Sequence, residues 1–199
     1  APALPRAAGA EASPHQALEG LCTAELPGRD RHPINCVDWA SADAYCRRAG
    51  KRLPKPDEWE YAVRGGAGRT YPWGEEAPSA NHLNGCGSEC KRWGQRHHLA
   101  LDALHAADDG FYGTAPVGTF PRGRSLEGVD DLLGNVMEWA DEGAGDGGAK
   151  PAAAAPRLVM GTGWNVGSAA ALRTPPRATL PGATRSHLVG FRCAASPRP

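Results

Sequence analysis

Hydrophobic residues recur at helical spacing in a stretch that begins near residue 39. Four residues fall on one face when residues 39–49 are drawn as a helix: Trp39, Ala42, Cys46 and Ala49. Asp38 precedes them and can cap the first turn, and Gly50 suits the left-handed residue that ends a helix. The pattern therefore predicts a short amphipathic helix.

A second helical pattern follows directly. Pro56 fits the first position of a helix, and the next two residues, Asp57 and Glu58, are acidic where the helix dipole favours acids. Trp59 and Val63 share one face, and a Gly-Gly pair then ends the pattern. A second short helix is predicted over about residues 56–64.

Beyond residue 66 the periodicity breaks into brief runs between Gly and Pro, such as "RTYPWGEE", "TAPVGTFPRG" and "RLVMGTGW". Such runs predict short strands and many turns, so the expected class is α+β with much irregular backbone. Residues 1–20 are expected to form a flexible tail, residues 21–199 one domain, and residues 141–156 an exposed surface loop.

The amino-acid composition limits the kinds of partner that the chain is expected to bind. The 199 residues, 41% hydrophobic, suffice for one domain with a core. Twenty-two basic and twenty-two acidic residues cancel, which argues against a nucleic-acid partner. No apolar run reaches the roughly 20 residues of a membrane helix.

Six cysteines allow 15 disulfide pairings, and an even set suggests an oxidising, extracytoplasmic compartment. One segment also carries five residues of types that bind zinc: His82, Cys86, Cys90, His97 and His98. Their spacing lacks the paired Cys-x2-Cys knuckles of structural zinc sites, so a disulfide or a plain surface loop is favoured there.

Six strings stand in an order that resembles one known family: "HPINCVDWASADAYCRRAGKRLPKPDEWEYAVRGG", "YPWG", "TAPVGTFP", "GVDDLLGNVMEWADE", "GTGWN" and "GFRCA". The chain is similar over about residues 32–195 to the formylglycine-generating enzyme (sulfatase-modifying factor) family. The resemblance implies a loop-rich, C-type-lectin-like fold with two short helices and short antiparallel strands. The family's Ile-Pro-Gly-Gly and Glu-Val-Thr motifs do not precede Cys22, so its N-terminal strands are expected to be missing or rebuilt, and the chain could be part of a larger multidomain protein.

The resemblance implies one disulfide, between Cys46 and Cys193. Cys22 with Cys36, and Cys86 with Cys90, are then the simplest remaining pairs.

The resemblance also implies two calcium sites, since this family builds such sites from carboxylates, amides and backbone carbonyls. Carried over, one site comprises Asp131, Gly134, Val136 and Glu138. The other comprises Asn81, His82, Asp109 and Phe111. The alternative for "GNVMEW" is a buried turn in which Asn135 satisfies backbone groups and Trp139 belongs to the core.

The family's copper chemistry is not expected here. It uses two cysteines shortly after a Gly-Gly-Ser motif, because soft thiolates bind Cu(I). No cysteine occurs between Cys90 and Cys193. The His-x3-His-x-Glu pattern of the iron-dependent relatives is also absent.

Residues around the same stretch could still line a binding pocket for a peptide or an anionic small molecule. They are Trp164, Asn165, Arg173, Arg177, Arg185 and His187. Equally, Trp164 could belong to the core, and the arginines could be solvated or structurally paired.

The leading hypothesis is a non-catalytic, calcium-stabilised binding or sensory module of an exported protein. One alternative is formylglycine-generating or related metal-dependent oxidase activity that uses another metal site. Another is a display scaffold whose C-terminal region is diversified to bind varied targets.

Overall fold

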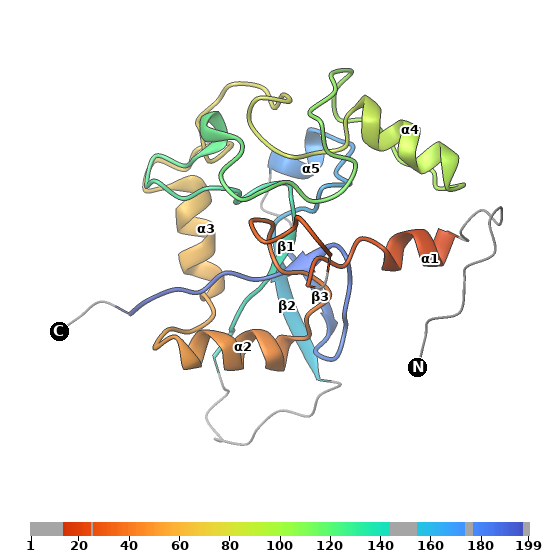
Figure 1. The fold of residues 1–199 in the computed structure, drawn as a ribbon. Coiled ribbons are helices and arrows are strands. Elements are labelled where there is room, and N and C mark those ends of the chain that lie inside the picture. The colour runs from red at the N-terminus through yellow and green to blue at the C-terminus, as the bar shows by residue number, and fades with distance from the viewer. Residues whose placement is uncertain (1–13, 25, 144–154, 174–176, 197–199) are drawn as a thin grey trace, which may run out of the picture.

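The computed structural model describes residues 14–24, 26–143, 155–173 and 177–196 (Figure 1). In these ranges the helices are α1 Pro14–Glu19, α2 Trp39–Arg48, α3 Pro56–Arg64, α4 Ser88–Arg96, the 3-10 turn η1 Pro121–Gly123 and α5 Ala170–Arg173. The strands are β1 Met137–Trp139, β2 Pro156–Met160, β3 Arg177–Pro181 and β4 Val189–Gly190. The expected α+β class is confirmed.

The four strands form one small sheet in the order β3-β2-β1-β4. β2 pairs antiparallel with β1, Trp139 opposite Val159, and also antiparallel with β3. The β1–β4 pair is parallel, with Met137 opposite Val189, so the expectation of antiparallel strands fails for this pair. The reason is the path of the chain, which leaves β3 at one edge of the sheet and enters β4 at the other.

The two predicted helices are confirmed as α2 and α3. The Asp38 carboxylate caps α2 by accepting a hydrogen bond of 2.8 Å from the Ser41 N–H. Gly50 adopts the left-handed conformation, with φ of 68°. Ala49 was expected on the buried face and is instead exposed, because the helix ends one residue earlier.

Helix α4 occupies the segment for which a disulfide or a surface loop was expected. Cys90 and Trp93 form its buried face, and the Cys86–Cys90 disulfide lies at its N-terminal end. Helix α1 lies within the span expected to be a flexible tail. Its Ala17 and Leu18 pack against the cluster that contains Trp93, which explains why this part of the tail is ordered.

Two of the runs that suggested strands form none. "RTYPWGEE" makes only an isolated bridge between Tyr71 and Gly74, and "TAPVGTFPRG" ends in the turn η1. The third run, "RLVMGTGW", contributes β2. Residues 1–13 of the expected tail and residues 144–154 of the expected loop lie outside the described residues.

Three disulfides confirm the expected pairing: Cys22–Cys36, Cys46–Cys193 and Cys86–Cys90. The second ties α2 to the C-terminal segment, and it lies in a cluster with Trp139 and Val159 of the sheet. A larger cluster joins Trp59 and Val63 of α3 to Met160. Within the described ranges, no helix is both long enough and apolar enough to cross a membrane.

Candidate functional site

A hollow of about 470 Å³ lies beside α5, where the family resemblance places the catalytic thiols. We call it the α5 hollow. Its lining residues are Ala100, Leu101, Asp102, Met137, Gly161, Thr162, Gly163, Asn165, Val166, Gly167, Ser168 and Ala171. The segment 161–171 therefore supplies most of its wall.

The backbone of this wall is held in place by neighbouring segments. The Val166 carbonyl accepts a hydrogen bond of 3.0 Å from the Cys86 N–H, and the Trp164 N–H donates to the Asn135 carbonyl at 2.8 Å. At Gly167 a Cβ atom would lie only 2.3 Å from the Asp102 carbonyl oxygen, so only glycine fits. The wall of the hollow is thus built in advance of any ligand.

The chemistry of the α5 hollow is that of a binding site. Its polar side chains are Thr162, Asn165, Ser168 and one carboxylate, Asp102, and its lining contains neither a thiol nor an imidazole. All six cysteines are described, and all are paired in disulfides. The chain therefore presents no thiolate with which to bind Cu(I) at this hollow.

A second hollow of about 470 Å³ lies at the edge of the sheet, and its lining includes Asp131, Val136 and Glu138 of the first predicted calcium site. The Glu138 carboxylate accepts two hydrogen bonds of 2.5 Å from Arg192 and one of 2.9 Å from the Trp59 indole N–H. Burial opposes the charge on Arg192, but Glu138 outweighs it and raises the pKa of Arg192. Glu138 thus already has a cationic partner.

Asp131 lines the same hollow, but its negative charge is compensated less well than that of Glu138. One of its carboxylate oxygens accepts a hydrogen bond of 2.7 Å from the Gly118 N–H. Burial nevertheless raises the pKa of Asp131. A carboxylate whose charged form is disfavoured in this way is a group that a bound cation would stabilise. Asp131 therefore fits a calcium ligand better than Glu138 does.

In the second predicted calcium site, Asp109 is the residue that fits a cation. One of its oxygens accepts a hydrogen bond from the Phe111 N–H, while the other, Oδ2, is buried without a hydrogen-bond partner. Burial, together with the nearby Glu89 carboxylate, raises the pKa of Asp109 to about 7. Asn81 is exposed, and the His82 ring stacks on Trp73.

Side chains alone do not bring together either of the two predicted sets of calcium ligands. Among the described residues, no hydrogen bond or ion pair joins Asn81 or His82 to Asp109. Nor do these residues contain a group of three or more His, Cys, Asp or Glu side chains placed to hold one metal ion. Backbone carbonyls and water would have to supply most of the six to eight oxygens that calcium takes.

The six predicted ligand-binding residues do not share one hollow. Asn165 lines the α5 hollow, whereas Arg173 lines a separate one. Arg177 pairs with Glu60, and Arg185 pairs with Asp38 at 2.6 Å. These last two are structurally paired, as the alternative interpretation has it.

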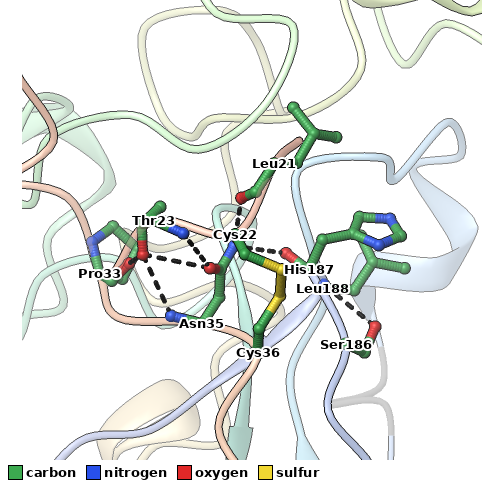
Figure 2. The surroundings of a disulfide bond; sticks show 9 residues. All are labelled: Leu21, Cys22, Thr23, Pro33, Asn35, Cys36, Ser186, His187 and Leu188. Carbon is green, nitrogen blue, oxygen red and sulfur yellow. Dashed lines mark hydrogen bonds between the residues drawn. A yellow bond between two sulfur atoms is a disulfide. The ribbon is translucent and has the colours of Figure 1, made fainter. Parts of the chain in front are cut away.

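Neither Trp164 nor His187 lines the α5 hollow. Trp164 is buried and packs edge-on against Trp93, so it belongs to the core, although its indole N–H has no hydrogen-bond partner. Figure 2 shows His187 beside the Cys22–Cys36 disulfide, where its carbonyl accepts a hydrogen bond of 2.9 Å from the Asn35 side chain. Burial lowers the pKa of His187.

Several residues that shape these sites were missed from the sequence. Arg192 belongs to the string "GFRCA". The feature that could have identified it is its charge inside an otherwise apolar run near the C-terminus. Glu89 lies in the first turn of α4, between the two disulfide-bonded cysteines, and no sequence pattern indicated its role. Arg64 and Tyr71, which line the hollow of Arg173, belong to strings that the family resemblance had marked only as fold motifs.

The fold and the thiol-free hollow define a class: a small α+β domain with a preformed pocket at its C-terminal segment. Residues 7–197 match the family described as the Sulfatase-modifying factor enzyme 1-like domain, and the chain belongs to that family. It is 35% identical over 170 residues to the "Inactive C-alpha-formylglycine-generating enzyme 2" of Mus musculus. The aligned region covers 82% of this chain and 49% of that protein.

Enzymes are among the relatives as well. The "Formylglycine-generating enzyme" of Streptomyces coelicolor is 41% identical over 120 residues, 59% of this chain and 34% of that enzyme. Among solved structures, PvdO from Pseudomonas aeruginosa matches with a TM-score of 0.56 at 25% identity, over 81% of this chain and 60% of PvdO. The chain therefore spans half or less of the length of these two curated relatives.

Proposed function

We propose that the chain is a non-catalytic binding module in which the α5 hollow holds the ligand. The observation that carries this proposal is the lining of that hollow: preformed walls, small and polar side chains, and no thiol. The six cysteines are all committed to disulfides, so no rearrangement short of reduction frees one for copper. The similarity to a relative named inactive supports the same proposal.

The ligand that best suits this site is a peptide segment. The α5 hollow is open along the exposed Ser168 and Ala171 and closed at its base by Gly161 and Thr162, which are buried. Small residues leave room for a ligand side chain, and the amide of Asn165, which lines the hollow, can donate to and accept from a peptide backbone. Oxidation of a substrate is not needed for such recognition.

Selection of short random peptides on the folded chain tests this proposal. The wild-type chain should enrich a shared motif, and Ala171→Trp should abolish the enrichment because the indole fills the open side of the hollow. Ala44→Trp is the matched control, since Ala44 is also exposed but lies on α2 and does not line the hollow. Failure of the wild-type chain to enrich any peptide, or an unchanged motif in Ala171→Trp, would contradict the proposal.

Calcium stabilisation is part of the proposed function. It is supported by Asp109, whose buried Oδ2 has no hydrogen-bond partner, and by the raised pKa of Asp131. The chemistry that calcium supplies here is charge compensation for these two carboxylates. Saturating calcium should raise Tm by about 5 °C or more over the chelator-treated chain, whereas identical melts would remove calcium from the account.

An extracytoplasmic location also belongs to this proposal. Three disulfides support it, because disulfides persist in oxidising compartments. Reduction should add the mass of two protons for each bridge to the intact protein, and an unchanged mass would contradict it.

A further inference from the structure

A third hollow, of about 370 Å³, lies at the C-terminal end of α5. Its lining residues are Arg64, Thr70, Tyr71, Glu75, Ala77 and Arg173. Arg64 is the last residue of α3, and Arg173 is the last residue of α5. Two cations from separate helices thus face one small space.

Both guanidinium groups retain capacity for an anion. Among the described residues, Arg173 has no carboxylate partner for its side chain. Arg64 donates one hydrogen bond of 3.3 Å, to the Arg173 carbonyl, and its Nε lies 3.7 Å from the Glu60 carboxylate without a hydrogen bond. The contact with the carbonyl of Arg173 also holds the two helix ends together.

Tyr71 gives the hollow a neutral hydrogen-bond donor. Its side chain is 3% exposed and its ring stacks on Trp73, so its position is fixed. Within the part of the chain that the structure describes, the hydrogen bonds of Tyr71 are those of its backbone with Gly74, and the residue lines the hollow. The hydroxyl is not fully enclosed by protein, so it is available to water or to a ligand in the hollow.

The charge of the hollow matches a singly charged ligand. Glu75 also lines it, and Thr70 keeps this carboxylate ionised by donating from its N–H and its hydroxyl, which lowers the pKa of Glu75. The lining residues, two arginines and one glutamate, leave one net positive charge, since Glu60 beside Arg64 is balanced by its pairing with Arg177. A carboxylate balances that charge, whereas a phosphate dianion does not.

We propose that Arg64, Tyr71 and Arg173 form a carboxylate-binding subsite next to the α5 hollow. Ala171 lines the α5 hollow and Arg173 lines the subsite, two residues apart on the same helix. The inference rests on the proposed function: a peptide in the α5 hollow that crosses α5 brings an acidic side chain or its C-terminal carboxylate to the two arginines.

The subsite can be tested without the natural ligand, by NMR of the arginine Nε–Hε signals of the whole chain. The probes are acetate, its neutral analogue acetamide and inorganic phosphate, each at constant ionic strength. Acetate should shift the Arg64 and Arg173 signals saturably, acetamide should not, and phosphate should bind no more tightly than acetate.

Variants locate the binding. Arg173→Gln should weaken acetate binding about fivefold, as expected for a partly exposed ion pair. Tyr71→Phe should weaken it about threefold, because it removes one neutral hydrogen bond and keeps the ring. Arg122→Gln, at an exposed arginine that pairs with Glu76, is the matched control and should leave acetate binding unchanged.

Equal shifts with acetate and acetamide, or unchanged acetate binding in Arg173→Gln, would overturn the subsite. Tighter binding of phosphate would overturn its assignment to a carboxylate. The peptide selection separates this from the parent proposal: peptides that bind the wild-type chain but lack an acidic residue remove the subsite alone. Saturable acetate binding without any selected peptide removes the binding module and leaves an isolated carboxylate site.

Discussion

Two parts of the domain are held together differently. The helix–sheet part, which comprises α2, α3 and the four strands, consists of regular elements that bury periodic apolar faces. The segment of residues 65–136 contains only the helix α4 and the turn η1 as helical elements, and it lies apart from α2 in Figure 1. Apolar residues of this segment such as Leu83 and Leu132 join the core, and between them its path is set by individual polar side chains in place of repeating backbone hydrogen bonds.

Asn135 shows how this works. Its side-chain oxygen accepts from the Ala115 N–H at 3.0 Å and from the Asn84 side chain at 3.1 Å, and its side-chain nitrogen donates to the Ala115 carbonyl. Asn84 in turn donates to the Gly113 carbonyl. One buried amide pair therefore satisfies three backbone groups of the loop 113–115 and ties that loop to residues 84 and 135. The comparison teaches that a few polar contacts can fix a segment for which regular structure is lacking.

The largest expected difference in stability between the two parts of the domain concerns their disulfides. Cys46–Cys193 spans 147 residues and joins α2 to the C-terminal segment, whereas Cys86–Cys90 spans four residues within the 65–136 segment. On the chain-entropy model, replacing the first pair by alanines should lower the free energy of unfolding by about 5 kcal/mol, and replacing the second by about 2 kcal/mol. Urea denaturation of the two double variants measures both.

An equal loss in the two double variants would break the comparison, because it would show that the short bridge supports the whole domain. Both variants remove two sulfur atoms from largely buried positions, so each serves as the packing control for the other.

The next effect concerns the amide pair. Asn135→Ala should lower the free energy of unfolding by about 2 to 3 kcal/mol, because the Ala115 N–H loses its partner while it remains buried. Asn81→Ala, at an exposed amide, should change it by less than about 0.5 kcal/mol when calcium is chelated. If the two variants melted alike, polar contacts would not be what holds the 65–136 segment.

The smallest effect is a pH dependence in the helix–sheet part. Arg52 forms two hydrogen bonds of 2.6 Å with Glu58 and lowers the pKa of that carboxyl to about 2. Its stabilisation is present above the unfolded pKa near 4.5 and is lost as the pH falls towards 2. Glu58→Gln should therefore cost about 0.5 to 1 kcal/mol at pH 7, discounted for solvent screening, and much less at pH 2, where the folded carboxyl is about half protonated.

Thermal melts at both pH values measure this difference. A penalty of the same size at pH 2 and pH 7 would mean that packing, and not the ion pair, accounts for the loss.

The same comparison explains what could be predicted from the sequence. The periodicity of residues 39–64 gave α2 and α3 because their apolar spacing and caps are local signals. Helix α4 was missed because its apolar face consists of a disulfide-bonded cysteine and one tryptophan within a polar, Gly-containing run. The Asn84–Asn135 pair joins residues 51 positions apart, and no local pattern reports such a contact.

For the candidate sites, the family resemblance identified the segments of the chain but not the residues with which the site residues pair. It placed Glu138 in a calcium site, and the structure adds Arg192 as its partly buried counter-charge from the far end of the chain. It grouped Arg173 with Arg177, whereas Arg173 shares a hollow with Arg64 and Arg177 pairs with Glu60. Which charged residues pair with each other depends on how distant elements pack. The sequence alone does not reveal that packing.

The central claim is that the α5 hollow binds without catalysing, and one measurement tests it most directly. The disulfide-intact chain is incubated with copper, oxygen and a sulfatase-type Cys-x-Pro-x-Arg peptide, and the peptide is examined by mass spectrometry for conversion of cysteine to the formylglycine aldehyde. No formylglycine aldehyde should form beyond the level of a protein-free control, whatever disulfide the peptide makes in copper and oxygen, because the lining of the hollow offers no thiolate to copper. Catalytic accumulation of the aldehyde would contradict it.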